Sequence, residues 1–296
     1  MSDQTTFERE GGAGLPEHPL PSAPEVTAVT VEQNAAAQAV AEGAMAVETT
    51  SVASVTVELG TSHFREANAA VRAALEQADT VVLTEVFAQR YLGCAMKAGK
   101  RLEIHGTPGN DLACYMDGGS VEVFGSAQDQ TANTMNAGSV VVHGRSGDAT
   151  GYAMRGGELL IRDDAGWRAA INMKQYGDRR PMVVIGGDAG DFLGEYMAGG
   201  VVVLMGRPGS HLASGMHGGV VYLQRAHVPS NLPQGLVACD LDAEDAKVLG
   251  GLLARYDRCF AGEVRPDGTV AAAAPLEAFV ALRPASSRPY AALYAS

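Results

Sequence analysis

The amino-acid sequence predicts an all-β fold, a single-stranded parallel β-helix of about seven coils, and three repeating features support this prediction. Gly or Ala stands three residues before each of seven regularly spaced methionines, Gly usually stands three residues after it, and two alternating apolar positions follow. A period near twenty residues is too short for a helix pair and too long for a nonapeptide calcium roll. Glycine corners and alternating Val, Ile and Leu are typical of strands. The methionines recur at spacings of 20, 19, 19, 19, 24 and 19 residues and are Met96, Met116, Met135, Met154, Met173, Met197 and Met216.

The repeats predict an internal ladder of methionines. Equivalent residues of successive coils lie about 4.8 Å apart, so these side chains are expected to stack inside the tube. Methionine suits this position because its unbranched chain fills irregular gaps, and burying each one stabilises the fold by about 1.5–3 kcal/mol. Glycines are expected where a corner needs positive φ or a close approach of the next coil. These structural glycines are Gly119, Gly138, Gly157, Gly200 and Gly219.

Two segments precede the coils. Residues 1–53 carry eight acidic side chains against Arg9 alone and are rich in Ala, Pro, Gly and Thr, which predicts a disordered acidic leader. Residues 54–90 are expected to form an α/β cap, with a strand at 55–59, a helix capped by Ser62 and a strand at 80–83. Such a β-α-β element would cover the first coil and its strand edges. The β-helix is then expected over residues 91–225.

The remaining residues, 226–296, are predicted to form a linker, a helix and a docking tail. The linker contains Pro229 and Pro233. A helix is expected over residues 243–260, because Asp242 is a good N-cap and the first turn is acidic. The end of the chain looks extended from Phe279 onward, and its aromatic residues predict that it docks on the rest of the protein.

Composition narrows the class of protein. The chain has 296 residues, 46% of them apolar, and a formal net charge of −12, of which the leader supplies seven units (eight acids minus one base). Basic residues neither cluster nor interleave with aromatic ones, which argues against nucleic-acid binding. No apolar run reaches the length of a membrane span, and the acidic start lacks the pattern of a signal peptide. The expected location is therefore the cytoplasm, without a membrane partner.

One repeat breaks the period, because five extra residues separate Met173 from Met197. The insertion runs from Lys174 to Pro181 and is strongly charged. A charged loop that projects from a regular tube is a candidate for partner contact, and a plain solvated loop is an equally good interpretation. The candidates for partner contact in this loop and in the C-terminal tail are Lys174, Tyr176, Arg179, Arg180, Arg288 and Tyr290.

The sequence predicts no catalytic, cofactor-binding or metal-binding residue. No Gly-x-Ser-x-Gly elbow or phosphate-binding glycine loop is present. Cys94 and Cys114 are expected to stack on adjacent coils, which is compatible with a disulfide, a shared metal or two buried small hydrophobes. Several aspartates recur five or six residues before a methionine; stacked carboxylates can bind Ca²⁺, but aspartate also favours turns. These aspartates are Asp111, Asp129, Asp148 and Asp191.

Several stretches resemble the C-terminal domain of the glutamate synthase large subunit. They are residues 187–206 (GDAGDFLGEYMAGGVVVLMG) and 215–222 (GMHGGVVY). The segments 89–93 (QRYLG), 109–113 (GNDLA), 151–157 (GYAMRGG) and 288–290 (RPY) are similar to the stand-alone form of that GXGXG-motif domain, a separate subunit. The resemblance runs from about Val55 to the end. The glycine register alone is shared with the C subunit of formylmethanofuran dehydrogenase.

The resemblance implies a right-handed parallel β-helix that scaffolds a complex and carries no active site of its own. In the family it packs against glutaminase and FMN/iron–sulfur synthase parts, which make glutamate from glutamine and 2-oxoglutarate in nitrogen metabolism, an oxidoreductase activity on CH–NH2 donors. FMN and iron–sulfur clusters are therefore expected on partner subunits and no cofactor on this chain. The alternatives are a scaffold of a formylmethanofuran dehydrogenase-type one-carbon complex and an independent hydrolase that would use Ser210 or Ser214.

Overall fold

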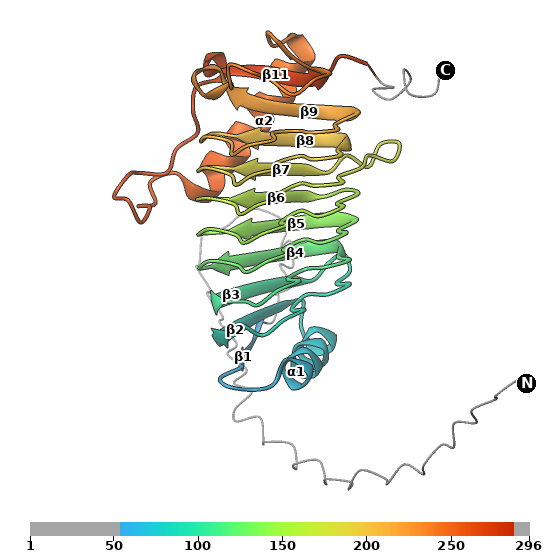
Figure 1. Cartoon of the computed structure of the whole chain (residues 1–296). Helices are drawn as coiled ribbons and strands as arrows, with labels where there is room; N and C mark the ends of the chain where they lie inside the picture. Colours follow the sequence, from blue (N-terminus) through green and yellow to red (C-terminus); the bar gives the residue numbers. More distant parts are fainter. Residues whose placement is uncertain (1–53, 287–296) are drawn as a thin grey trace, which may run out of the picture.

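The computed structural model describes residues 54–286, which form a solenoid built on one eleven-stranded sheet. The strand order is β1-β2-β3-β4-β5-β6-β7-β8-β9-β11-β10, and each pair from β1 to β9 is parallel, as the stacked arrows of Figure 1 show. The strands are β1 (Ser54–Glu58), β2 (Thr80–Phe87), β3 (Arg101–Thr107), β4 (Asp117–Phe124), β5 (Ala137–Val142), β6 (Glu158–Ile161), β7 (Met182–Ile185), β8 (Ala198–Leu204), β9 (Gly218–Gln224), β10 (Leu236–Cys239) and β11 (Phe279–Pro284). The helices are α1 (Phe64–Gln77) and α2 (Ala243–Phe260), with short 3-10 turns at Arg225–His227 and Leu276–Ala278.

This architecture confirms the predicted parallel β-helix, with a small difference in the number of coils. Eight successive strands, β2 to β9, form its rungs, whereas the methionines predict about seven coils. The extra rung is the last strand of the cap. Thr80 of β2 pairs with Arg101 of β3 in the same register that the later coils keep, so the cap continues directly into the tube.

The N-terminal cap packs α1 beside β1 and β2 through Ala67, Val71 and Ala74. The prediction that Ser62 caps this helix is wrong, because His63 is the N-cap and its Nδ1 accepts a hydrogen bond from the Arg65 amide. The Ser62 amide donates to the Leu59 carbonyl at 3.0 Å, which places Ser62 inside the preceding turn and moves the start of the helix by one residue.

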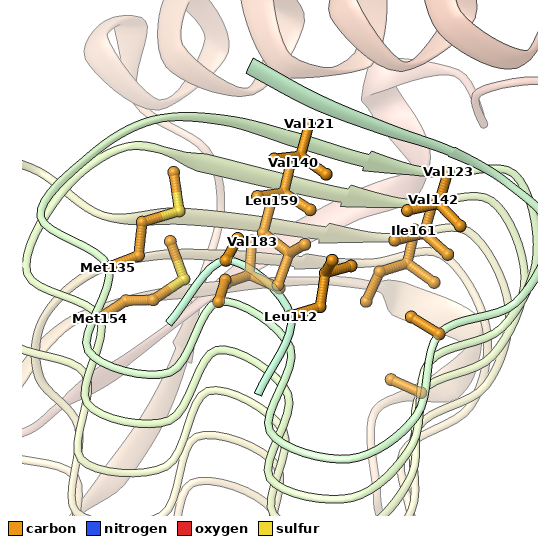
Figure 2. Close-up of a cluster of buried hydrophobic side chains, with 14 of the residues drawn as sticks. Leu112, Val121, Val123, Met135, Val140, Val142, Met154, Leu159, Ile161 and Val183 are labelled. Atoms are coloured by element: carbon orange, nitrogen blue, oxygen red, sulfur yellow. The ribbon is translucent and has the colours of Figure 1, made fainter. Parts of the chain in front are cut away.

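The seven methionine side chains lie inside the tube, as predicted, beside two rows of aliphatic side chains. All seven methionines are buried, with exposed fractions between 0% and 6%. Figure 2 shows Met135 and Met154 stacked on one side, with Val121, Val140 and Leu159 in a second row and Val123, Val142 and Ile161 in a third. Strand register produces these rows, because a parallel pairing places every second residue of each strand on the same inner face.

In five coils the glycine three residues after the methionine makes room for the methionine of the preceding coil; these are Gly119, Gly138, Gly157, Gly200 and Gly219. An ideal Cβ on Gly200 would lie 2.9 Å from Met173 Cε and 2.7 Å from the Pro181 carbonyl oxygen. Gly119 and Gly138 show the same relation to the Cε atoms of Met96 and Met116. The glycine and methionine positions are therefore coupled, because the missing Cβ of the glycine leaves space for the terminal methyl of the methionine in the preceding coil.

The segment before each methionine is a turn rather than a strand. In every coil the residues five, three and one position before the methionine have positive φ; in the second coil they are Asp111, Ala113 and Tyr115. Their amides alternate in direction, because Asp111 donates to the Asp129 carbonyl of the next coil and Ala113 to the Leu92 carbonyl of the previous coil. This alternating ladder satisfies the backbone of the turns between coils.

A second hydrophobic core lies outside the tube, under α2. Val141, Leu160, Val184, Val203 and Tyr222 form one outward-facing row that is buried against α2, whereas the equivalent residues of β3 and β4 are Glu103 and Glu122. Helix α2 has the predicted bounds and begins with a capping box between Asp242 and Asp245.

The far end of the sheet is covered by antiparallel pairing. Strand β11 pairs with β9 on one side and with β10 on the other, so the predicted extended segment from Phe279 is a strand of the same sheet. The predicted contact residues Arg288 and Tyr290 lie outside the described residues. Within the described part of the chain, no helix combines the length and the apolarity needed to cross a membrane.

Candidate functional site

The recurrent aspartates form hydrogen bonds between coils. Asp129 Oδ1 accepts from the Asp148 amide at 2.9 Å, Asp148 Oδ1 from the Trp167 amide at 2.8 Å and Asp191 Oδ1 from the Ser210 amide at 2.7 Å. Asp111 differs, since it accepts from Asn133 Nδ2. Among residues 54–286 no group of three or more His, Cys, Asp and Glu side chains is placed to hold a metal ion. Three of these four carboxylates thus accept a hydrogen bond from a backbone amide of the next coil.

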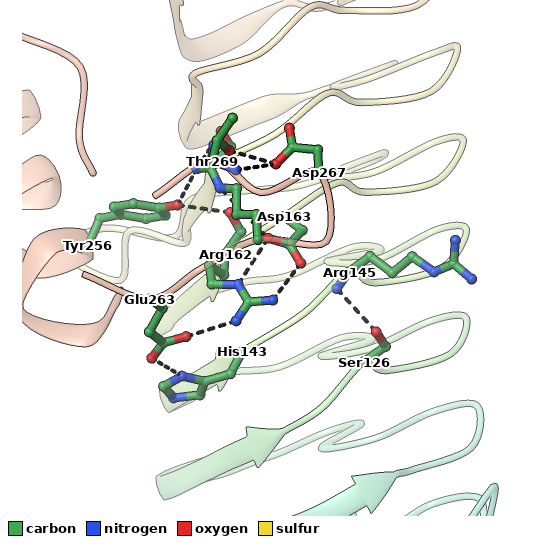
Figure 3. Close-up of polar contacts among 11 residues, drawn as sticks. Ser126, His143, Arg145, Arg162, Asp163, Tyr256, Glu263, Asp267 and Thr269 are labelled. Carbon is green, nitrogen blue, oxygen red and sulfur yellow. Dashed lines mark hydrogen bonds and ion pairs between the residues drawn. The ribbon is translucent and has the colours of Figure 1, made fainter. Parts of the chain in front are cut away.

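A polar network joins the hairpin after α2 (residues 263–271, in which Val264 pairs with Val270) to the outside of the tube (Figure 3). His143 contacts Glu122 with Nε2 at 3.1 Å and Glu263 with Nδ1 at 2.7 Å. Arg162 donates to Glu263 at 2.9 Å and forms a two-pronged ion pair with Asp163. Burial opposes ionisation of Glu122, but hydrogen bonds from His143 and Arg101 outweigh it and hold the pKa of Glu122 below its usual range.

Next to this network lies an open polar cleft of about 710 Å³. Asp163, Asp188, Arg145 and Arg265 line it, so both signs of charge face the space. Arg265 donates to the Gly186 carbonyl and to the Tyr256 hydroxyl, which in turn donates to the Arg162 carbonyl. Burial raises the pKa of Tyr256. These contacts fasten the hairpin to the coils, and no nucleophile in the network is hydrogen-bonded to a base.

The residues of the hydrolase alternative are not arranged as a catalytic pair. The His211 ring stacks on Phe192, with centroids 4.7 Å apart and an interplanar angle of 8°. Within the described residues, neither the Ser210 nor the Ser214 hydroxyl is hydrogen-bonded to a histidine nitrogen. A cleft of about 330 Å³ borders these residues, but a general base must reach the proton it removes.

The predicted contact loop, here called the insertion (residues 174–181), is a short hairpin. Tyr176 and Arg179 exchange two backbone hydrogen bonds of 3.2 and 3.1 Å, and Lys174 Nζ lies 5.0 Å above the Tyr176 ring. The side chains from Lys174 to Arg179 are exposed, whereas Arg180 is half-buried. Figure 1 shows this hairpin projecting from the tube beside β7. Four of the predicted contact residues are thus grouped at one place.

A second candidate surface, which the sequence pattern did not predict, lies on the turns of the tube. The turns that precede the methionines lie on the side of the tube away from the strands and α2, as Figure 2 shows, and we call their outward side the turn face. It consists of the outward side chains of residues 90–97, 110–117, 129–136, 148–155, 167–174, 191–198 and 210–217. Its exposed aromatic residues are Tyr91, Tyr115, Tyr152, Trp167 and Tyr196.

The aromatic rings of the turn face are held out by the backbone. Trp167 is 58% exposed, Tyr115 55% and Tyr196 48%. The tyrosines at 115 and 196 occupy the position just before the methionine, where φ is positive and the following side chain points inward. Tyr and Trp are enriched in the cores and hot spots of protein interfaces. The insertion begins directly after Met173, where one turn ends, so it borders the turn face.

This chain is similar to a known protein family and to individual known proteins. A family model described as the GXGXG motif matches residues 52–262. Uncharacterized protein MJ1350 of Methanocaldococcus jannaschii is 41% identical over 184 residues, which cover 57% of this chain and 70% of that protein. A chain of the formyltransferase/hydrolase complex FhcABCD from Methylorubrum extorquens, solved with methylofuran, aligns with a TM-score of 0.48 and 27% identity. That alignment covers 60% of this chain and 66% of the other chain, just under two thirds of its length.

Proposed function

Because the chain belongs to the GXGXG motif family, the family of the C-terminal domain of the glutamate synthase large subunit, we propose that it is a structural subunit of a glutamate synthase-type complex. Its role would be to hold together the glutaminase and the FMN/iron–sulfur synthase subunits, which make glutamate from glutamine and 2-oxoglutarate. FMN and the clusters would be bound by those partners. This chain would supply surface rather than chemistry.

The turn face is the observation that carries the proposal. Five exposed aromatic rings lie on one side of a rigid tube, and the hairpin of the insertion stands at its border. Large exposed apolar groups concentrated on one face mark interaction sites. A solenoid also suits this task, because it presents an extended rigid surface that several partners can share.

The polar groups of the tube support the structural role. Asp129, Asp148 and Asp191 accept hydrogen bonds from backbone amides of the next coil, and the charged network beside α2 is paired internally. A catalytic group would instead be oriented toward an open space with a base or an oxyanion donor nearby. Most of the ionisable side chains described above already hold the coils together or fasten the hairpin after α2 to them.

The experiment is reconstitution from separately purified proteins. The full chain is mixed with the glutaminase and the FMN/iron–sulfur synthase subunits of the same organism, and the mixture is separated by size exclusion while flavin and cluster absorbance are recorded. The proposal expects this chain to elute with the coloured subunits and to raise glutamine-dependent glutamate synthesis. A chain that elutes alone and leaves synthesis unchanged would contradict it. Elution with the subunits of a formylmethanofuran dehydrogenase-type complex would favour the one-carbon scaffold.

Matched variants locate the contact. Trp167→Ala removes a ring that is 58% exposed on the turn face, and Phe87→Ala removes a ring that is 61% exposed at the end of β2. The proposal expects only Trp167→Ala to weaken the assembly. Arg179→Glu tests the insertion in the same assay.

A further inference from the structure

Cys94 and Cys114 occupy the same position of adjacent coils, two residues before Met96 and Met116. Two inter-coil hydrogen bonds bracket them: the Ala95 amide donates to the Cys114 carbonyl at 2.9 Å, and the Ala113 amide donates to the Leu92 carbonyl at 2.8 Å. An ideal Cβ on Gly93 would lie 3.8 Å from Ala113 Cα, which shows how closely the two turns stack. Equivalent residues of neighbouring coils lie about 4.8 Å apart, inside the Cα–Cα range of disulfides, about 4.4–6.8 Å.

The two thiols differ in access to solvent. Both cysteines are free; Cys94 is exposed and Cys114 is buried. The Cys114 thiol hydrogen-bonds to the sulfur of Cys94, and this contact, aided by Arg72 of α1 and opposed by burial and Asp111, lowers the pKa of Cys94 to about 7. The same hydrogen bond and burial raise the pKa of Cys114. A reactive and accessible thiol thus stands beside a protonated thiol that is shielded from solvent.

We propose that Cys94 and Cys114 form a peroxide-reactive dithiol site, in which exposed Cys94 is oxidised first and buried Cys114 then closes an inter-coil disulfide. This pairing of an accessible, activated cysteine with an adjacent resolving cysteine is typical of thiol sensors. Both cysteines lie in the first two segments of the turn face. The proposal does not rest on the proposed role in a complex, because the isolated full chain suffices to test it.

The oxidation proceeds in two steps, with hydrogen peroxide as the oxidant. The Cys94 thiolate attacks one peroxide oxygen, the O–O bond breaks, and Cys94 sulfenic acid and hydroxide are formed. The Cys114 sulfur then attacks the Cys94 sulfur, the S–O bond breaks, and the thiol proton leaves with the departing hydroxyl as water. The two sulfurs lose two electrons in total, and peroxide is reduced to two equivalents of water once hydroxide is protonated.

The test uses the reduced full chain and dilute hydrogen peroxide. After treatment, remaining thiols are alkylated and the protein is digested with trypsin, which separates the two cysteines because Lys97, Lys100 and Arg101 lie between them. Non-reducing mass spectrometry is expected to find a disulfide that joins the Cys94 and Cys114 peptides. In Cys114→Ser, dimedone is expected to trap sulfenic acid on Cys94. In Cys94→Ser, the disulfide is expected to disappear.

Cys239 is an internal control, because it is exposed on β10 and has no cysteine neighbour on an adjacent strand. Alkylation of Cys94 by iodoacetamide is expected to be half-maximal near pH 7, where it holds roughly tenfold more thiolate than an ordinary cysteine. Size exclusion of both serine variants verifies that they remain folded. The proposal is overturned if peroxide oxidises Cys94 and Cys239 at equal rates, or if Cys94 is oxidised without forming a bond to Cys114.

Discussion

Replacing Gly200 by alanine tests the coupling between the glycine and methionine repeats. Gly200 has a φ of +91°, and a Cβ there would lie 2.7 Å from the Pro181 carbonyl oxygen and 2.9 Å from Met173 Cε. The methyl group of Met173 can move, but the Pro181 oxygen is held by a 2.9 Å hydrogen bond from the Val201 amide. The unfavourable φ costs about 1–2 kcal/mol and the crowding about 1–3 kcal/mol. We expect a total loss of about 2–5 kcal/mol.

The assay is thermal unfolding followed by far-UV circular dichroism, with two matched glycine variants. A loss of that size lowers the Tm by roughly 4–20 °C in a domain of this length. Gly177→Ala has a φ of +56° but no atom within 4 Å of the new Cβ, so it reports the cost of φ alone. Gly250→Ala lies inside α2 with open space around it and is expected to stabilise the helix by about 0.5–1 kcal/mol. If Gly200→Ala unfolds at the same temperature as Gly177→Ala, the packing argument is wrong.

Two further predictions concern stability. Met154→Asp places a carboxylate in the fully buried ladder and is expected to abolish the cooperative unfolding transition. Arg179→Glu on the exposed insertion is expected to leave the Tm unchanged. An equal loss of stability in both variants would contradict the division between core and surface. Burial opposes ionisation of Asp245, but hydrogen bonds from Arg283 and Tyr222 outweigh it and hold the pKa of Asp245 below its usual range. The ionised carboxylate therefore adds to the free energy of unfolding above about pH 4, and this stabilisation is lost as the pH falls through the lowered pKa. Asp245→Asn should therefore reduce the acid-induced fall of the urea midpoint, and an unchanged pH profile would contradict this assignment.

Much of the tube could be predicted because its repeat is local. Each coil repeats the same small residue, methionine, glycine and alternating apolar pair, so the period alone determines which residues stack. The start of helix α2 was also predictable, because Asp242 is a good N-cap. Its position was not predicted, although continuous apolar runs such as those of β6 and β8 indicate strands buried on both faces, in contrast to the alternating pattern of β3.

The features that were missed depend on contacts between distant segments. The pairing of β11 with β9 joins residues about sixty positions apart in the sequence, so no local turn motif predicts it. The aromatic turn face was hidden for another reason. Tyr115 and Tyr196 stand just before the methionine, but Tyr152 and Trp167 stand at other positions of the turn. Only the exposed fractions of these side chains in the folded chain show that all four rings point outward.

The most direct test of the proposed scaffold is the affinity of the chain for its glutaminase and FMN/iron–sulfur partners, measured by titration calorimetry for the wild type, Trp167→Ala and Phe87→Ala. An interface anchor contributes at least 2 kcal/mol, so we expect Trp167→Ala to raise the Kd by roughly 30-fold or more. Phe87→Ala, which removes an equally exposed ring outside the turn face, is expected to leave the Kd unchanged. Equal Kd values for the two variants, or no binding by the wild type, would contradict the account.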